Sequence, residues 1–317
     1  MCTIASLITS NDFLPGLQTM VHSLKSTMSA ADLSATALVC LVTPAVTADV
    51  RAKIEQLGVA CLNVSELGPP PSGDASVPQW KDTYTKLHVF DPSIYASPPS
   101  AVLYIDADCV VCRDPLPAAL ALSSDPSWPH LSAAPDVFPP DRFNAGVLLL
   151  RPAASTFERL ISLIPVLRSY DGGDTGFLNA AFPDWHVGPA SGRMKFNMNA
   201  QRTLHWLTFS KRPGYWENVV DPSQFDSRSP PSEGGRGGGG TGDVVILHCS
   251  SSPKPWESGA KRGDLEMVWW ASYTAFLAAP PSAATSRDDE KAVMRRYKAL
   301  RKEGLGAKEA MERAKTG

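Results

Sequence analysis

Short, almost uninterrupted apolar runs alternate with segments of helical periodicity in the first third of the chain. The apolar runs lie at 4–9, 36–43 and 59–64, and apolar residues recur at helical spacing over 17–24 and 46–58. A short, nearly all-apolar run is typical of a strand that is covered on both faces. The alternation therefore predicts a βαβαβ arrangement, in which parallel strands are joined by right-handed crossovers.

The rest of the chain adds further strands and helices to this pattern. Apolar runs predict strands at 101–108, 130–136, 143–152 and 243–249. Helical periodicity predicts helices at 81–90, 156–170, 174–182 and 264–277. Asp174 follows a Gly-Gly pair and is expected to be the N-cap of the third of these helices. The expected fold class is α/β, with a Rossmann-like mixed sheet that is mostly parallel and flanked by helices.

Composition and charge divide the chain into a large domain and a tail. The predicted domain covers residues 1–280 and contains a Gly-rich insert at 229–242, which we expect to be flexible. A linker and a charged helical tail are predicted for 281–317. From Arg287 onward the chain has 10 basic and 6 acidic residues, a net charge of +4, against 20 basic and 26 acidic residues before it, a net charge of −6. The tail is therefore a separate compositional unit.

The overall charge and the cysteines exclude several classes of protein. A net charge of −2 is not that of a nucleic-acid-binding protein, which would carry a basic face. No signal peptide is visible, and the apolar stretch around 267–279 is too short to span a bilayer, so we expect a cytoplasmic protein. The six cysteines are scattered, and several lie in apolar runs. Buried thiols are therefore expected, including at the Cys109–Cys112 pair.

Two aspartates end the apolar run at 101–108, with one residue between them. Ligands of open α/β sheets bind at the carboxyl ends of strands, and alternate strand residues share a face. Asp106 and Asp108 are therefore expected to face one pocket. Two carboxylates this close repel each other unless a cation or a proton lies between them, and Mg²⁺ or Mn²⁺ prefers such ligands. A helix cap or a turn is the alternative role for these aspartates.

Polar residues elsewhere in the chain support a site for a phosphorylated ligand. His248 ends the last predicted strand and could add an imidazole ligand, and Lys254 follows six residues later as a point charge suited to a diphosphate. Asn144 could hydrogen-bond a hydroxyl-rich ligand, and Gly146 would let backbone approach closely. Asp174 is expected at a helix start beside the cleft, and Lys86 would supply another cation. These residues alone predict a metal-dependent enzyme that acts on a phosphorylated substrate.

The order and spacing of these motifs resemble glycosyltransferase family 8, and within it the glycogenin-like members. The matching stretches cover roughly residues 3–257, and YIDAD and FNAG are the more specific ones. The full set comprises Thr9-Ser10-Asn11, TKLH around Lys86, YIDAD, AAPD ending at Asp136, FNAGV, DGGD followed by GFLN, Asn199, and His248 followed by KPW.

The resemblance implies a GT-A fold, a UDP-sugar donor such as UDP-glucose, Mn²⁺ or Mg²⁺, and retention of anomeric configuration. By position it implies that Asp106, Asp108 and His248 bind the metal and that Asp174, Lys86 and Lys254 are catalytic. It implies that the donor and acceptor are bound by Thr9, Ser10, Asn11, Asp106, Asp136, Asn144, Ala145, Gly146, Thr175, Asn199 and Ser251. The acceptor would be a carbohydrate, a polyol or a protein, and a homodimer is compatible with the resemblance.

Asp174 has two alternative roles in such an enzyme. Retention needs either attack on the same face as the leaving group or a covalent intermediate, and Asp174 is the carboxylate that could face the sugar from the opposite side. The alternative role, which we favour, is to orient the hydroxyl groups of the sugar. In either case the metal and Lys254 would stabilise the charge of the departing UDP.

Four positions depart from the pattern of the family. Thr175 replaces a Gln, Ser251 replaces a Gly, Leu14 replaces an aromatic residue expected near the uracil, and Trp206 stands where glycogenin has its acceptor Tyr. We therefore expect an external acceptor rather than self-glucosylation. Three alternatives remain: a degenerate member that binds nucleotide-sugar or glycan without turnover, a glycogenin-type primer, and a metal-dependent phosphohydrolase.

Overall fold

A computed structural model of the chain describes residues 2–69, 78–136, 141–203, 244–260 and 263–279. The chain divides into two compact units, Met1–Phe276 and Leu277–Gly317. The Gly-rich insert, Trp206 and the charged tail lie outside the described residues. The expectations for these segments, and the predicted domain boundary at 280, stay predictions.

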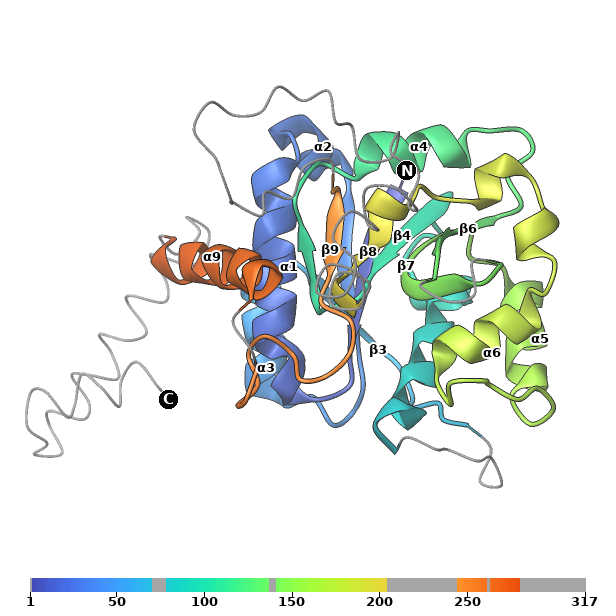
Figure 1. The fold of residues 1–317 in the computed structure, drawn as a ribbon, viewed down its shortest axis with the longest axis horizontal. Helices are drawn as coiled ribbons and strands as arrows, with labels where there is room; N and C mark the ends of the chain where they lie inside the picture. The colour runs from blue at the N-terminus through green and yellow to red at the C-terminus, as the bar shows by residue number, and fades with distance from the viewer. Residues whose placement is uncertain (1, 70–77, 137–140, 204–243, 261–262, 280–317) are drawn as a thin grey trace, which may run out of the picture. The chain divides into compact units, whose positions relative to one another are not determined.

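The central sheet has six strands in the order β3-β2-β1-β4-β7-β6 (Figure 1). β1, β2, β3 and β4 run parallel to one another, whereas β7 is antiparallel to both β4 and β6. The strands are β1 (Cys2–Ile8), β2 (Ala37–Val42), β3 (Ala60–Asn63), β4 (Ala101–Ile105), β6 (Leu131–Pro135) and β7 (Phe143–Leu150). The α/β fold class with a mixed, mostly parallel sheet is confirmed.

A second, three-stranded sheet lies in the order β5-β9-β8. It consists of β5 (Cys109–Val111), β8 (Ala200–Gln201) and β9 (Ile246–His248). The sequence predicted one strand through Asp108, but the strand ends at Ile105 and β5 begins after a turn. The apolar residues that resume at Cys109 therefore pair with β9 rather than extending β4.

Helices cover both faces of the central sheet, with α1 and α3 on one side and α5 and α6 on the other (Figure 1). The α-helices are α1 (Leu14–Thr27), α2 (Ala30–Ala35), α3 (Ala48–Gln56), α4 (Leu116–Ser123), α5 (Ala154–Leu163), α6 (Asp174–Ala181) and α9 (Asp264–Ala278). The 3₁₀-helices are η1 (Asn11–Phe13), η2 (Pro78–Phe90), η3 (Pro92–Ile94), η4 (Trp185–Val187), η5 (Ala190–Gly192) and η6 (Phe196–Asn199). No helix among the described residues is both long and apolar enough to span a membrane.

The predicted helix at 156–170 was too long. α5 ends at Leu163, directly before Ile164 and Pro165. Ile164 keeps right-handed helical backbone, but Pro165 has no N–H group to continue the helical hydrogen bonds. The apolar residues that follow α5 therefore do not belong to a regular helix.

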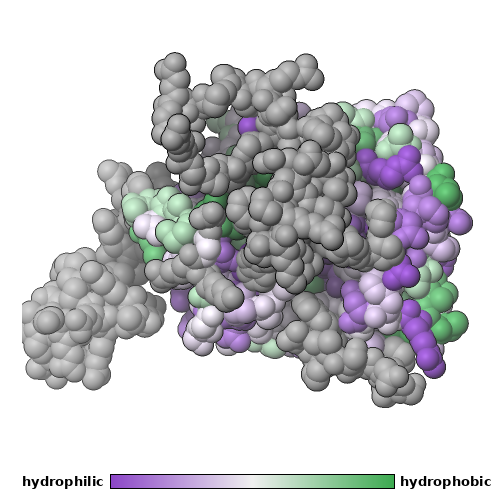
Figure 2. Space-filling view, in the orientation of Figure 1, coloured by the Kyte–Doolittle hydropathy of each residue, from purple (hydrophilic) through white to green (hydrophobic). Residues whose placement is uncertain are grey.

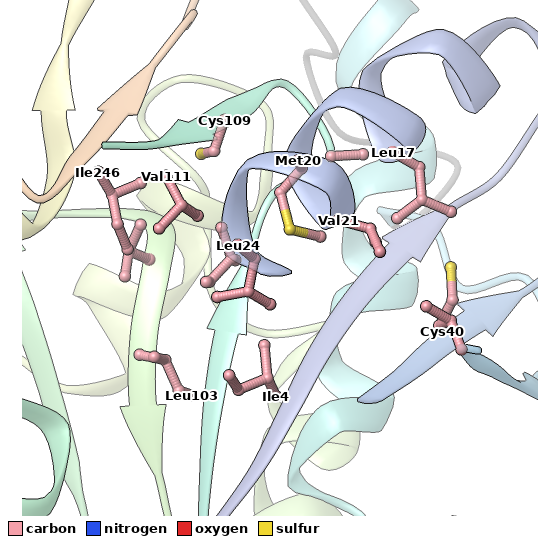
Figure 3. Packing of buried hydrophobic residues seen from close by; sticks show 14 of the residues in the cluster. Ile4, Leu17, Met20, Val21, Leu24, Cys40, Leu103, Cys109, Val111 and Ile246 are labelled. Carbon is pink, nitrogen blue, oxygen red and sulfur yellow. The ribbon is translucent and has the colours of Figure 1, made fainter. Parts of the chain in front are cut away.

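Each face of the central sheet has its own apolar cluster. Figure 3 shows Met20, Val21 and Leu24 of α1 facing Ile4 of β1 and Leu103 of β4. On the other face, Tyr104 and Leu148 pack with residues of η2, α5 and α6, among them Leu87, Leu160 and Phe177. Because the strands are covered on both sides, nearly every residue of β1, β4 and β7 is buried.

A third cluster joins α9 to the small sheet. The fully buried Trp269 of α9 packs with Val110 of β5 and Leu247 of β9. All six cysteines are free. Four of them, including Cys109, are buried as predicted, whereas Cys112 and Cys61 are only half-buried. On the surface beside α5 and α6, Figure 2 shows hydrophobic and hydrophilic residues interspersed.

Candidate active site

A pocket of about 570 Å³ opens where the order of the central sheet reverses. From β1 the chain crosses to β2 and β3 on one side, and it later returns to β4 on the other side. Loops at the carboxyl ends of two such strands diverge, which leaves a crevice that commonly binds ligands. Thr9 and Ser10 follow β1, Asp106 follows β4, and all three line the pocket.

The structure brings most of the predicted site residues together, although they come from distant parts of the chain. Those that line the pocket are Thr9, Ser10, Lys86, Asp106, Asp108, Asp136, Asn144, Gly146, Asp174, Thr175, His248, Ser251 and Lys254. Three predicted residues do not line it: Asn11, Ala145 and Asn199.

A turn rather than a strand presents the two aspartates of YIDAD to the pocket. The N–H of Asp106 donates to the carbonyl of Gly146 at 2.8 Å, and the N–H of Cys109 donates to the carbonyl of Asp106 at 3.1 Å. The expected geometric reason, alternation along a strand, was therefore wrong, although both side chains line one pocket. Gly16 of α1 packs on this turn, because a Cβ there would lie 2.6 Å from the carbonyl oxygen of Ala107.

Two lysines neutralise the aspartates of the pocket. Nζ of Lys254 lies 2.5 Å from Oδ2 of Asp108. Nζ of Lys86 lies 3.1 Å from Asp106 and 2.5 Å from Asp174, and it donates to the carbonyl of Ala145 at 2.9 Å. All of these side chains are largely buried except that of Asp106, which is about a quarter exposed. The lysines therefore hold the carboxylates in place in a low dielectric.

Burial and the lysines act in opposite directions on the pKa values of this cluster. Burial by itself raises the pKa of Asp108, but the ammonium group of Lys254 lowers that pKa well below its usual range, and a protonated His248 would lower it further. At Asp174 burial prevails over Lys86, so the pKa of the carboxyl group is raised. Burial lowers the pKa of Lys86, but Asp106 and Asp174 raise it above its ordinary value. Asp108 is therefore the firmly ionised carboxylate of the site.

A hydrogen bond fixes the ring of His248. Its Nδ1 lies 2.9 Å from Oδ1 of Asn199, and the side-chain amide of Asn199 donates to Oδ1 of Asn144 at 2.9 Å. Because the carbonyl oxygen of an amide only accepts, Nδ1 carries the proton, and in the neutral imidazole the lone pair of Nε2 faces the aspartates. Asn199 is fully buried, does not line the pocket, and orients the histidine.

Gly146 provides the space that the imidazole occupies. A Cβ at this position would lie 2.2 Å from Cε1 and 2.5 Å from Nδ1 of His248. We expected this glycine to allow close approach of backbone to a ligand. Gly146 lines the pocket, so that expectation stays a prediction, and the structure adds the ring of His248 as a second neighbour.

The atoms around Asp108 suit a divalent cation. Oδ1 of Asp108 is buried, forms no backbone or lysine hydrogen bond among the described residues, and lies 3.3 Å from Nε2 of His248. Oδ2 of Asp106 lies 4.0 Å from the same nitrogen. Hard oxygen atoms and an imidazole lone pair are a donor set for Mn²⁺ or Mg²⁺.

The Cys109 thiol also lies near this potential metal site. Ligand atoms of Asp108, Cys109 and His248 all lie within 4.8 Å of one another. Burial, with Asp108 and Asp106, raises the pKa of Cys109 well above its ordinary value, and the residue packs in an apolar cluster. We therefore retain Asp106, Asp108 and His248 as the predicted ligands.

Asn11 and Ala145 support the walls of the pocket from outside. Oδ1 of Asn11 accepts from the N–H of Thr47 at 3.0 Å, which joins the loop after β1 to the start of α3. The N–H of Ala145 donates to Oγ1 of Thr175 at 3.2 Å. The hydroxyl of Thr175 is thus engaged with β7, although the residue lines the pocket.

The predicted N-cap of α6 was off by one residue. Gly173 is the N-cap, and Asp174 is the first helical residue. The carboxylate of Asp174 is bound by Lys86 and so does not cap the helix, while its N–H donates to Oγ1 of Thr83 at 3.0 Å. The site, rather than the helix end, determines the orientation of this side chain.

Sequence reasoning missed several residues that line the pocket: Phe13, Asp82, Thr83, Asp171, Gln201, Thr203 and Ser250. Phe13 directly precedes Leu14, the position at which an aromatic residue was expected. Matching the loop after β1 to the family pattern with a shift of one residue would have identified Phe13 as the expected aromatic residue. Gln201 and Thr203 follow Asn199 without any motif of their own.

No family model matches the chain. Glycogenin-1 of Caenorhabditis elegans is 27% identical over 296 residues, which are 91% of this chain and 58% of that protein. Glycogenin of Neurospora crassa is 25% identical over 282 residues, 85% of this chain and 34% of that protein. The chain spans about half or less of the length of these curated relatives.

Solved structures of glycosyltransferases share the fold. An active-site mutant of LgtC superposes with a TM-score of 0.56 at 16% identity, over 89% of this chain and 98% of that chain. The glycosyltransferase GlyE of Streptococcus pneumoniae gives a TM-score of 0.55 at 19% identity, over 88% of this chain and 63% of that chain. The chain is thus similar in sequence to glycogenins over most of its length, and it has the GT-A fold of glycosyltransferases.

Proposed function

We propose that this protein is a metal-dependent, retaining hexosyltransferase that moves a hexose from a UDP-sugar to an external acceptor. The observation that carries the proposal is the junction of Asp108, His248 and Lys254 at the switch point of the sheet. An ionised carboxylate, an imidazole lone pair and a buried ammonium group are what a cation-bound diphosphate requires. A divalent cation there would stabilise the negative charge of the leaving diphosphate.

The nucleoside would bind at the loop that follows β1. Thr9 and Ser10 supply hydroxyl groups, and Phe13 supplies an aromatic ring at the wall of the pocket. The ring of Phe13 packs edge-to-face on Trp256, with centroids 5.8 Å apart. Phe13 therefore provides the stacking surface for uracil that Leu14 lacks.

The sugar would lie between Lys86, Asp136, Asn144 and Asp174. Lys86 already binds Asp174 at 2.5 Å, so this carboxylate is a fixed acceptor for sugar hydroxyl groups rather than a free nucleophile. Transfer with retention would then proceed by attack on the same face as the leaving group. Lys254 would remain beside the diphosphate as charge develops on it.

Binding without turnover is the second candidate function, and one contact favours it. Thr175 stands in place of the glutamine of the family, and its hydroxyl group accepts from the N–H of Ala145. It is therefore less available to position a donor. The ion pair of Lys254 with Asp108 and the intact Asp108–His248 geometry favour turnover instead.

Incubation with a panel of UDP-sugars, with and without Mn²⁺, tests the proposal. Thermal shift identifies the bound donor, and UDP release measures transfer or slow hydrolysis of the donor. We expect Mn²⁺-dependent release of UDP from one hexose donor. A thermal shift without any release would favour the binding module, and hydrolysis of simple phosphate esters would favour a phosphohydrolase. A glucosylated tyrosine found by mass spectrometry would favour a self-priming protein.

A further inference from the structure

Arg202 is a fully buried arginine that follows β8 and does not line the pocket. Its Nη2 donates to three carbonyl groups of one loop: those of Ser250 at 2.9 Å, Ser251 at 3.1 Å and Pro253 at 3.0 Å. This loop joins His248 of β9 to Lys254. One guanidinium group therefore binds the backbone of the loop that carries Lys254, the ammonium group of the proposed diphosphate site.

Glu266 of α9 compensates the charge of Arg202. Its Oε1 lies 3.2 Å from Nη1, and its side chain is 1% exposed. A buried guanidinium group is costly without a partner, and a single carboxylate also fixes its orientation. α9 is thereby joined to the loop through the arginine, although Glu266 itself does not line the pocket.

The carbonyl groups that face Arg202 determine where the loop's N–H groups point. In a trans peptide the C=O of one residue and the N–H of the next point in opposite directions. The N–H groups of Ser251 and Ser252 therefore point away from Arg202. Ser250, Ser251 and Lys254 all line the pocket. We therefore infer that the side of the loop away from Arg202 faces the pocket.

Two further features hold this arrangement. Ser251 has a φ of +68°, a conformation that reverses the backbone and brings successive peptide N–H groups toward a common side. Oγ1 of Thr203, directly after Arg202, lies 2.8 Å from the hydroxyl of Ser251 and 2.9 Å from that of Ser250. Residues 202 and 203 thus bind both the backbone and the side chains of the loop.

We propose that Arg202, held by Glu266, is a positioning residue that shapes the 250–254 loop into a diphosphate-binding surface. The N–H groups of Ser251 and Ser252 and Nζ of Lys254 would contact the phosphate oxygens, and Arg202 would contact none. The inference rests on the proposed function, because it requires a diphosphate ligand. It makes α9 a structural part of the active site.

Binding of UDP and of uridine by Arg202→Lys and Glu266→Gln tests this role. Both ligands would occupy the nucleoside site, but only UDP would reach the loop. Arg202 binds Glu266 through Nη1 and the loop carbonyl groups through Nη2, and the single ammonium group of a lysine cannot bridge both. We expect Arg202→Lys to weaken UDP binding about tenfold or more and uridine binding less than about twofold. Glu266→Gln, which keeps the side-chain shape, should show the same selective loss to a smaller extent. If Arg202→Lys does not fold, Glu266→Gln alone tests the positioning role.

Arg159→Lys is the matched control, because Arg159 donates to the carbonyl of Ala181 at 3.0 Å on the far side of the sheet. It should leave both affinities unchanged. Equal weakening of UDP and uridine, or no weakening of UDP in either variant, would overturn the positioning role. If the wild-type protein binds no UDP, the proposed function fails and this inference falls with it.

Discussion

At the scale of single residues, the orientation of His248 depends on what surrounds it. Asn199 binds its Nδ1, and Gly146 leaves room for the ring. Both residues determine where Nε2 points. Residues that orient a metal-binding histidine commonly affect metal affinity by 10- to 100-fold.

Gly146→Ala should therefore weaken Mn²⁺ binding by about tenfold or more, because the new methyl group displaces the imidazole. Isothermal titration with Mn²⁺ measures this change. Gly188→Ala is the control, because a Cβ there makes only ordinary contacts at 3.4 and 3.5 Å. Unchanged Mn²⁺ affinity in Gly146→Ala would show that His248 is not a ligand.

Asp108→Asn should lower Mn²⁺-dependent turnover by about 100-fold or more, because the ionised ligand of the site is lost. The initial rate of UDP release measures it, and circular dichroism verifies that the variant is folded. Asp49→Asn, at an exposed position of α3, should retain wild-type activity. Full activity in Asp108→Asn would refute the metal assignment.

His88 should make the protein less stable in mild acid. Burial lowers the pKa of its imidazole below the ordinary value of 6.5, against a smaller opposing effect of the Ser65 carbonyl. The unfolded chain therefore binds the proton more readily. The stabilisation is present above about pH 6.5 and is lost as the pH falls through the lower, folded-state value.

The melting temperature, measured from pH 7.5 to 5.5, tests this effect of His88. The decrease should be smaller in His88→Gln than in the wild-type protein. His186→Gln, at an exposed position, should follow the wild-type curve. Parallel curves for His88→Gln and the wild type would exclude His88 as the source of the pH dependence.

At the scale of elements, α1 joins the nucleoside loop to the core. Its N-terminal end carries Gly16, which packs on the Asp106–Asp108 turn, while Leu17, Met20 and Leu24 are buried against the sheet (Figure 3). The helix therefore supports both the fold and the geometry of the proposed metal site.

Leu24→Ala should lower the free energy of unfolding by about 2–5 kcal/mol, because it leaves a cavity between α1 and the sheet. Chemical denaturation followed by circular dichroism measures this loss. Leu120→Ala in α4, where the side chain is 44% exposed, should cost less than about 1 kcal/mol. A similar small effect at Leu24 would contradict the packing described for α1.

At the scale of the whole molecule, local sequence pattern predicted the strands but not how they pair. The apolar runs identified β1, β2, β3, β4, β6, β7 and β9 from their composition. Nothing local in YIDADCVV indicates that its second half joins another sheet, because that pairing depends on β9, which lies far along the chain. The two-residue β8 has no detectable pattern at all.

At the candidate site, too, local sequence predicted individual residues but not the contacts that the fold creates between them. Charged and polar motifs predicted Asp106, Asp108, His248 and Lys254, which all line the pocket, because several such groups recur together after predicted strands. Arg202 could not be identified, because its role exists only through carbonyl groups about 50 residues away in the sequence. Asn199 was recognised by position, but its contact with His248 appears only in the folded chain.

The central claim is that one pocket binds a nucleoside diphosphate through a divalent cation. Isothermal titration of the wild-type protein with UDP, first with excess Mn²⁺ and then with EDTA, tests it most directly. The account predicts binding of UDP that is at least about tenfold tighter with Mn²⁺. Equal affinity in both conditions, or no binding of UDP in either, would contradict it.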